Sequence, residues 1–224
     1  MKARLLTAMI VVTGFVAVQG ALGLPLNLLN DTITYNTGIE ATANWNNSGT
    51  WLSWEITQLD ANLWHYEYVW HTDGRDLSHI IIELTEGAVE SDFSNWQFEY
   101  SGLEDEGPLF GWFTPDQGNS NPGMPGPIYG VKLNLESDTP VFGFSFDTWR
   151  PPVWGDFYAK DGRLGGADVY AYNLGFALAD ANDGLHIGVP NGHIRISDGG
   201  LTAALLGLSA LCMRLLRGRL GAKA

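Results

Sequence analysis

The sequence is poor in cysteine, in basic residues along its middle, and in segments with a helical period. Of its 224 residues only one is a cysteine, Cys212, and it lies in an apolar run near the C-terminus. The rest of the chain can form no disulfide and offers no cysteine nucleophile. Extracellular domains of eukaryotic type often contain disulfides, so this absence is typical of a bacterial envelope protein.

Positive charge is scarce between the two tails. Residues 24–196 contain six basic and twenty-four acidic residues, a net charge of −18. Such a domain repels nucleic acid and anionic membrane surfaces, so we expect no nucleic-acid partner. The charge is compatible with divalent cations, with neutral glycans, or simply with solubility.

Catalytic motifs are missing as well. The sequence contains no GxSxG, HExxH or HxH pattern, which leaves serine hydrolase chemistry and a local zinc site without support. His65 and His71 are six residues apart on one predicted strand, too far to share a metal ion at about 3.3 Å per residue. We therefore expect no enzymatic activity. A glycan hydrolase remains a distant alternative, because two carboxylates about 5 Å apart could come from any of the acidic residues.

Aromatic residues and glycine are abundant instead, and they alternate with polar residues in short runs. Residues 63–71 place four aromatic rings on one face, those of Trp64, Tyr66, Tyr68 and Trp70. Residues 50–59 alternate in the same way, and the turn residues Asp60-Ala61-Asn62 lie between the two runs. This arrangement predicts a β-hairpin with one buried aromatic face.

Further strands are predicted at short intervals, at residues 77–84, 93–100, 109–113, 128–135, 141–148, 157–160, 167–174 and 185–189. Many short strands separated by turn residues predict an all-β fold over residues 24–196, a single antiparallel β-sandwich of jelly-roll or Ig-like type. A barrel satisfies the same pattern. The prolines of residues 115–127 predict a surface loop, and Asp161-Gly162 predicts a turn.

Two sets of residues are candidates for ligand contact. Trp45, Trp51 and Trp112 adjoin polar or glycine-rich segments and could form a stacking platform for a glycan, whereas core packing is the alternative. Asp180, Asn182 and Asp183 supply oxygen ligands for calcium next to a glycine, although their spacing is not that of an EF-hand. A looser acidic set is Asp156, Asp161 and Asp168, and ordinary turn chemistry is the alternative for both acidic sets. We expect no other cofactor.

The N-terminus has the three parts of a secretory signal peptide. Lys2 and Arg4 precede an apolar run from Leu5 to Val18, and small residues follow it. The run is shorter than the roughly 20 residues of a permanent membrane span. Residues 1–23 are therefore predicted to be a signal peptide removed by signal peptidase, with cleavage after Gly20 or Gly23.

The C-terminus, residues 197–224, also has three parts. Ser197, Asp198, Gly199 and Gly200 precede an apolar run from Leu201 to Met213, and Arg214, Arg217 and Arg219 follow. As a helix the run is about 20 Å long, and continuing it to about residue 217 brings it nearer to the roughly 30 Å of a bilayer core. The basic end is expected to stay cytoplasmic and to leave the acidic domain outside.

This tail resembles the sorting signal of bacterial surface proteins processed by exosortases, the PEP-CTERM class and its VPDSG-like variants. Ile196-Ser197-Asp198-Gly199-Gly200 occupies the motif position, although Ile196-Ser197 replaces the Val-Pro of that variant. The segment from Trp154 to Gly162, followed by Tyr170 to Phe176, is similar to a pattern in domains of such proteins.

The resemblance implies a precursor tethered to the inner membrane, cleavage by an exosortase-type protease, and delivery to the cell surface or the exopolysaccharide matrix. It implies no catalytic residues. We expect a structural or adhesive matrix protein. The alternative is a carbohydrate-binding module, with or without calcium.

Overall fold

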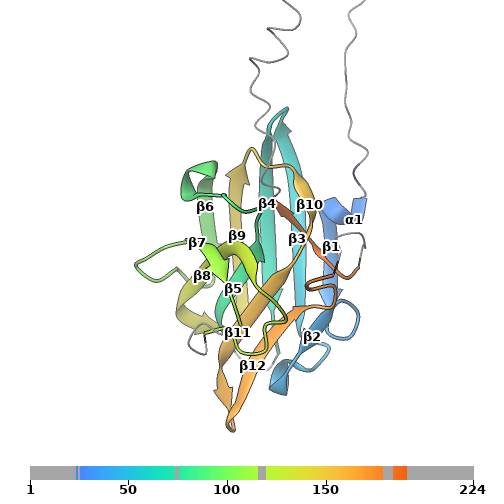
Figure 1. The fold of residues 1–224 in the computed structure, drawn as a ribbon, viewed down its shortest axis with the longest axis vertical. Helices are drawn as coiled ribbons and strands as arrows, with labels where there is room; N and C mark the ends of the chain where they lie inside the picture. The colour runs from blue at the N-terminus through green and yellow to red at the C-terminus, as the bar shows by residue number, and fades with distance from the viewer. Residues whose placement is uncertain (1–23, 25, 74–75, 116–119, 179–183, 191–224) are drawn as a thin grey trace, which may run out of the picture.

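The computed structural model describes residues 24, 26–73, 76–115, 120–178 and 184–190, which form an all-β fold of antiparallel sheets (Figure 1). Sheet A has the strand order β1 (Asn30–Thr34), β3 (Trp51–Asp60), β4 (Leu63–His71), β9 (Val141–Thr148) and β6 (Phe93–Glu99). Sheet B has the order β2 (Ile39–Ala41), β12 (Ala167–Asn173), β11 (Phe157–Leu164), β5 (Leu77–Glu83), β8 (Ile128–Thr139) and β7 (Leu109–Phe113). A third, small sheet pairs β10 (Pro152–Gly155) with β13 (Ile187–Pro190). The helical elements are α1 (Leu26–Leu29), η1 (Ala43–Trp45) and η2 (Glu90–Asp92).

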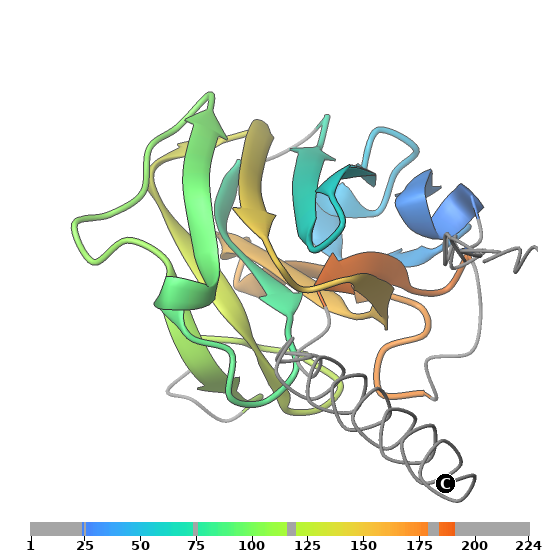
Figure 2. The ribbon, with the colours of Figure 1, turned by 90° about the horizontal axis from the view of Figure 1, so that it is seen from above.

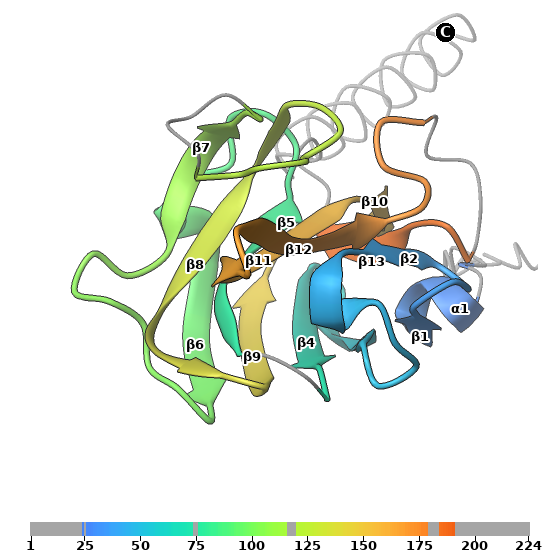
Figure 3. The same cartoon turned by 90° about the horizontal axis from the view of Figure 1, so that it is seen from below.

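Sheets A and B lie in two layers, as Figure 3 shows, and the inner faces of both contribute to one core. Sheet A supplies the aromatic face of β4 together with Phe142, Phe144 and Phe146 of β9, all buried. Sheet B supplies Ile80, Ile82 and Phe157, and Phe157 meets Trp70 at 5.9 Å between ring centroids. Stacked aromatic rings on neighbouring strands thus fill the space between the layers, which is typical of a sandwich.

The predicted hairpin is confirmed. Strands β3 and β4 pair in antiparallel register from Trp51 and His71 to Asp60 and Leu63. The Asp60 carboxylate accepts a hydrogen bond of 2.6 Å from the Ala61 N–H and so closes the turn. Alternating apolar and polar residues predicted this hairpin, because each strand buries its apolar face and leaves its polar face toward solvent.

Strand β13 is buried along its whole length and lies beside α1 in Figure 2. The Tyr68 hydroxyl donates to the Gly188 carbonyl at 2.7 Å, and the Trp54 indole N–H donates to the Leu28 carbonyl at 2.9 Å. Burial raises the pKa of Tyr68 well above its ordinary value, so the hydroxyl remains a donor. Hydrogen bonds from core aromatic residues therefore hold both the small sheet and α1 against one side of the sandwich.

A second, smaller core covers the outer face of sheet B. Its buried members are Ile81, Phe113, Met124, Ile128, Tyr158 and Phe176. Asn121 and Met124, from the proline-rich stretch, are buried, so the prediction of a simple surface loop was wrong for this part of it. Gly123 lies directly against Tyr170, where a Cβ would be 2.0 Å from the ring. The stretch packs onto sheet B because its apolar and small residues fit over the tyrosines there.

The turn predicted at Asp161-Gly162 was wrong as well. Strand β11 continues through both residues to Leu164, with an irregular register between Lys160 and Arg163. The chain turns at Gly165 and Gly166, whose φ angles are +59° and +88°. A bulge and a turn share the same residue preferences, and here two glycines in the left-handed region provide the tighter reversal.

Within the described ranges, no helix is long and apolar enough to cross a membrane. The predicted signal peptide, residues 1–23, and the predicted sorting tail, residues 197–224, lie outside these ranges. The same is true of the helix predicted at about residues 201–217.

Candidate functional site

A groove of about 330 Å³ lies where sheet B meets the small sheet. The ends of β5, β7 and β8 form one side of it, and β10 and β13 form the other. Its lining combines three aromatic residues, Trp112, Tyr129 and Trp154, with two carboxylates, Glu83 and Glu86. This volume lies at the lower end of the range for small-ligand sites.

Trp112 is the most exposed aromatic side chain of the groove. It pairs across the strands with Tyr129, and the two rings meet edge to face at 5.7 Å. Phe110, two residues earlier on the same face of β7, packs on Phe93 at 5.2 Å inside the sandwich. Trp112 lies beyond that contact, and 50% of its surface is exposed. The sheet therefore presents a large aromatic ring to solvent on its edge strand β7.

Trp154 forms part of the opposite side of the groove. The rings of Trp154 and Trp54 are perpendicular, with centroids 6.5 Å apart and planes at 88°. Val153 and Val189 form a neighbouring cross-strand pair in the small sheet, and both line the groove. Core contacts thus fix the position of Trp154 on one side while its other side faces the groove.

Glu83 and Glu86 are the charged side chains among the described residues that line the groove. A carboxylate oxygen of Glu83 accepts a hydrogen bond of 2.7 Å from the backbone N–H of Asp156. Gly155 permits this approach, because a Cβ there would be 3.0 Å from the same carboxylate and 2.4 Å from Val189. Glu86 is exposed in the turn that follows β5. The groove therefore combines aromatic faces with negative charge.

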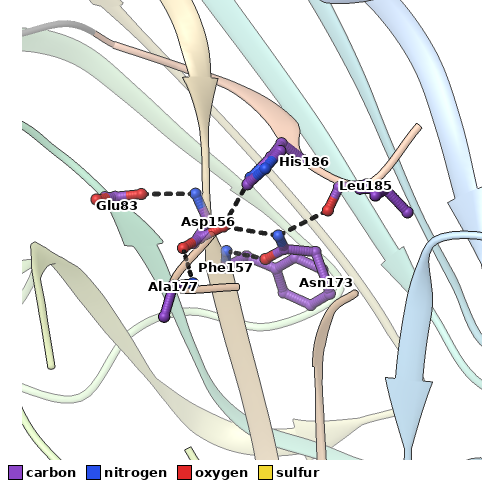
Figure 4. A network of polar contacts seen from close by, with 7 residues as sticks. All are labelled: Glu83, Asp156, Phe157, Asn173, Ala177, Leu185 and His186. Atoms are coloured by element: carbon purple, nitrogen blue, oxygen red, sulfur yellow. Dashed lines mark hydrogen bonds and ion pairs between the residues drawn. The ribbon is translucent and has the colours of Figure 1, made fainter. Parts of the chain in front are cut away.

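A buried polar network lies behind Glu83 (Figure 4). Asp156 accepts hydrogen bonds from Asn173 at 2.7 Å and from the Ala177 N–H at 3.0 Å, and its carboxylate lies 3.0 Å from Nδ1 of His186. The amide of Asn173 also donates to the Leu185 carbonyl at 2.8 Å and accepts from the Phe157 N–H at 2.8 Å. Asp156, Asn173 and His186 are all at least 97% buried.

This network joins parts of the chain that are distant in sequence. It connects the start of β11, the end of β12 and the segment that leads into β13. Glu83 accepts from the Asp156 N–H, and the groove residues Trp154 and Val189 are two and three residues away in sequence from Asp156 and His186. The network therefore helps to hold these three groove residues in place. Buried polar groups with complete hydrogen bonding fix a local structure strongly.

A second polar pocket, of about 540 Å³, lies on the outer face of sheet A. Nδ1 of His65 lies 2.6 Å from one carboxylate oxygen of Asp147, and the Asn95 amide donates to the other at 2.6 Å. Asn95 has a φ angle of +54° at an irregular register between Ser94 and Gln97. Trp96 packs on Phe146 at 4.7 Å, so its ring belongs largely to the core. This pocket lacks the exposed aromatic ring that distinguishes the groove.

The three tryptophans predicted as glycan contacts lie in different places. Trp45 is fully buried against Trp70 at 5.1 Å, so the expected exposure of Trp45 was wrong. Trp51 is partly buried on the outer face of sheet A, where it stacks on His71 at 4.9 Å. Trp112 is half exposed in the groove. The polar residues next to Trp45 did not indicate whether its ring is exposed, because they flank the helical turn η1, which buries Trp45.

The acidic residues considered for calcium are not gathered at one site. Asp156 belongs to the buried network, Asp161 accepts from Ser78 at 3.2 Å, and Asp168 pairs with Arg163 at 2.8 Å. Asp180, Asn182 and Asp183 lie outside the described residues. Within the described part of the chain, no group of three or more His, Cys, Asp or Glu side chains has a geometry that could hold a metal ion.

The residues of the sorting prediction also lie outside the described part. They are Ser197, Asp198, Gly199 and Gly200 of the motif and Arg214, Arg217 and Arg219 of the basic end.

Sequence reasoning missed Glu83, Glu86, Tyr129 and Trp154 as members of one site. They come from strand ends separated by up to 71 residues, and no local spacing connects them. The one signal was the unusual segment from Trp154 to Gly162. It includes the strand predicted at residues 157–160, and it contains both a groove residue, Trp154, and the centre of the buried network, Asp156.

Comparison with family models, with curated proteins and with solved structures gives no match for this chain.

Proposed function

We propose that this protein is a non-enzymatic, exported carbohydrate-binding protein that adheres to extracellular polysaccharide through the groove. The observation that carries the proposal is the half-exposed Trp112, which lines the groove together with Glu83, Glu86 and Trp154. This proposal combines the adhesive role and the glycan-binding alternative that were expected from the sequence, because the protein would adhere to polysaccharide by binding it.

The chemistry of the groove suits a sugar. The C–H faces of a pyranose ring are apolar and pack on a flat indole, whereas the ring hydroxyls need hydrogen-bond acceptors and donors. Carboxylate oxygens accept hydrogen bonds from hydroxyls, and the exposed carboxylate of Glu86 lines the groove together with Glu83. The aromatic residues Trp112, Tyr129 and Trp154 stand on strands, so their backbone loses little conformational entropy when a ligand binds.

A glycan array tests the proposal, using the full chain with and without EDTA. We expect binding that EDTA leaves intact and that Trp112→Ala reduces about 5- to 30-fold, because stacking on one tryptophan contributes on the order of 1–2 kcal/mol. Trp51→Ala is the matched control, since Trp51 is a partly exposed tryptophan on another sheet.

Loss of binding in Trp51→Ala but not in Trp112→Ala would place the site elsewhere. Binding abolished by EDTA would favour the calcium-assisted alternative. Absence of binding to any glycan would refute the function.

We further propose that the chain is exported by its signal peptide and tethered by its C-terminal helix. An exosortase-type protease then cleaves the tail near Asp198-Gly199 and releases the domain to the cell surface or matrix. The placement of the basic residues in the two tails supports this orientation. Mass spectrometry of the secreted protein tests it, and an intact Arg217-Gly218-Arg219 end would refute processing.

For the topology we propose a jelly-roll-like variant of the sandwich. The antiparallel pairs β4–β9 and β5–β8 are nested in sequence and lie in different sheets, which supports this assignment over an immunoglobulin-like one.

A further inference from the structure

The charge of the groove narrows the ligand class. We infer that the groove prefers glycans that carry free amino groups, such as de-N-acetylated hexosamine polymers, over neutral and anionic polysaccharides. This inference rests on the proposed carbohydrate-binding function.

The first argument is the sign of the charged side chains. Both charged residues that line the groove in the described part of the chain are glutamates, Glu83 and Glu86. Glu83 is oriented by the Asp156 N–H at 2.7 Å, and Glu86 is exposed nearby. A protonated sugar amine provides three donors and a positive charge, and charge-assisted hydrogen bonds to carboxylates are stronger than those of a neutral hydroxyl.

The second argument is the aromatic surface. Trp112 exposes half of its side chain, and the indole face is the best partner for a cation among the aromatic side chains. An aminosugar can therefore place its apolar face on the ring and its ammonium group near the ring or the glutamates. A neutral sugar also packs on the ring, but its hydroxyls make weaker, uncharged hydrogen bonds to the glutamates.

The third argument concerns long-range charge. Residues 24–196 have a net charge of −18, which attracts a polycation and repels uronate, sulfate or phosphate groups. An anionic polymer would have to bring its negative charges next to Glu83 and Glu86. Repulsion between these like charges opposes binding. The charge of the groove and the net charge of the domain therefore both favour cationic glycans over anionic ones.

Isothermal titration calorimetry with the full chain tests this preference. The ligands are a glucosamine hexamer at a pH where its amines are protonated, the fully N-acetylated hexamer, and oligogalacturonate of equal length. We expect the glucosamine hexamer to bind at least about tenfold more tightly than the N-acetylated one, and its affinity to fall with added salt. Oligogalacturonate should bind least.

Glu86→Gln removes one charge with little change of shape. It should weaken binding of the glucosamine hexamer about threefold, the effect of an exposed ion pair, and leave binding of the N-acetylated hexamer unchanged. The matched control is Glu67→Gln, because Glu67 is exposed on β4 of sheet A and does not line the groove. The control should leave both affinities unchanged.

The outcomes separate this inference from the proposed function. Equal binding of the amine and N-acetylated hexamers, or equal effects of the Glu86 and Glu67 variants, would overturn the amine preference while carbohydrate binding stands. Failure of all three hexamers would overturn both. A short polylysine peptide provides a further check: if it binds as tightly as the glucosamine hexamer and competes with it, the groove recognises cations in general and the sugar assignment is wrong.

Discussion

At the scale of single residues, the groove depends on a few buried polar side chains. Asp156 connects Asn173, Ala177 and His186, and its own N–H orients Glu83. Alternation in the sequence predicted the strand that follows Asp156, but it could not indicate these partners, since they come from other strands and loops. A buried carboxylate with several donors is recognisable only once the fold has brought them together.

Replacing Asp156 tests this role. Asp156→Ala leaves two side chains and one backbone N–H without their acceptor, and it should lower the free energy of unfolding by about 3 kcal/mol. Urea denaturation measures the change. Asp168→Ala is the control, because its pair with Arg163 is exposed and should contribute little. Equal losses in the two variants would contradict a special role for the network.

His79 gives a second prediction at this scale. Burial lowers the pKa of His79 well below its ordinary value, and Lys132 and Lys160 lower it further. The unfolded chain binds a proton below about pH 6.5 that the folded chain does not bind, so stability falls as pH decreases through that value. His79→Gln should reduce the loss of stability between pH 7 and pH 5 by about 2 kcal/mol, since about 1.4 kcal/mol is lost per pH unit below pH 6.5.

Urea denaturation at several pH values provides the measurement for His79. The same pH slope in the variant and the original chain would show that His79 does not remain neutral in the folded state.

At the scale of elements, the sequence predicted best those strands that bury one face only. Strands β4, β7 and β9 have the predicted bounds, because their aromatic and polar residues alternate clearly. Strands β1, β2 and β10 are short, and the residue pattern did not predict them. Their positions depend on tertiary contacts more than on local pattern.

Gly188 in β13 provides a test of how the small sheet is held. A Cβ there would be 2.5 Å from the Leu28 carbonyl and 2.7 Å from Ile56, so Gly188→Ala should destabilise the fold by about 2 kcal/mol. Gly126→Ala is the matched control, because its Cβ would meet only Ala177 at 3.6 Å. Thermal unfolding compares the two. A Tm for Gly188→Ala equal to that of the control would contradict tight packing of β13 in the core.

At the scale of the whole molecule, the sequence predicted the fold class and an acidic domain, and it singled out Trp112 as a candidate contact. It could not predict the groove, because the groove forms only where one end of sheet B meets the small sheet. It also could not separate Trp112 from Trp45, since both adjoin polar residues and only the packing of the sheets buries one of them. The proposed function therefore depends on tertiary structure.

The central claim is that a sugar ring lies on Trp112 in the groove. A crystal structure of the protein soaked with the oligosaccharide that binds most tightly tests this claim most directly. The account predicts a pyranose ring stacked on the exposed face of Trp112, with its polar groups directed toward Glu83 and Glu86. A sugar bound instead at Trp51 on sheet A, or at the pocket of His65 and Asp147, would contradict it.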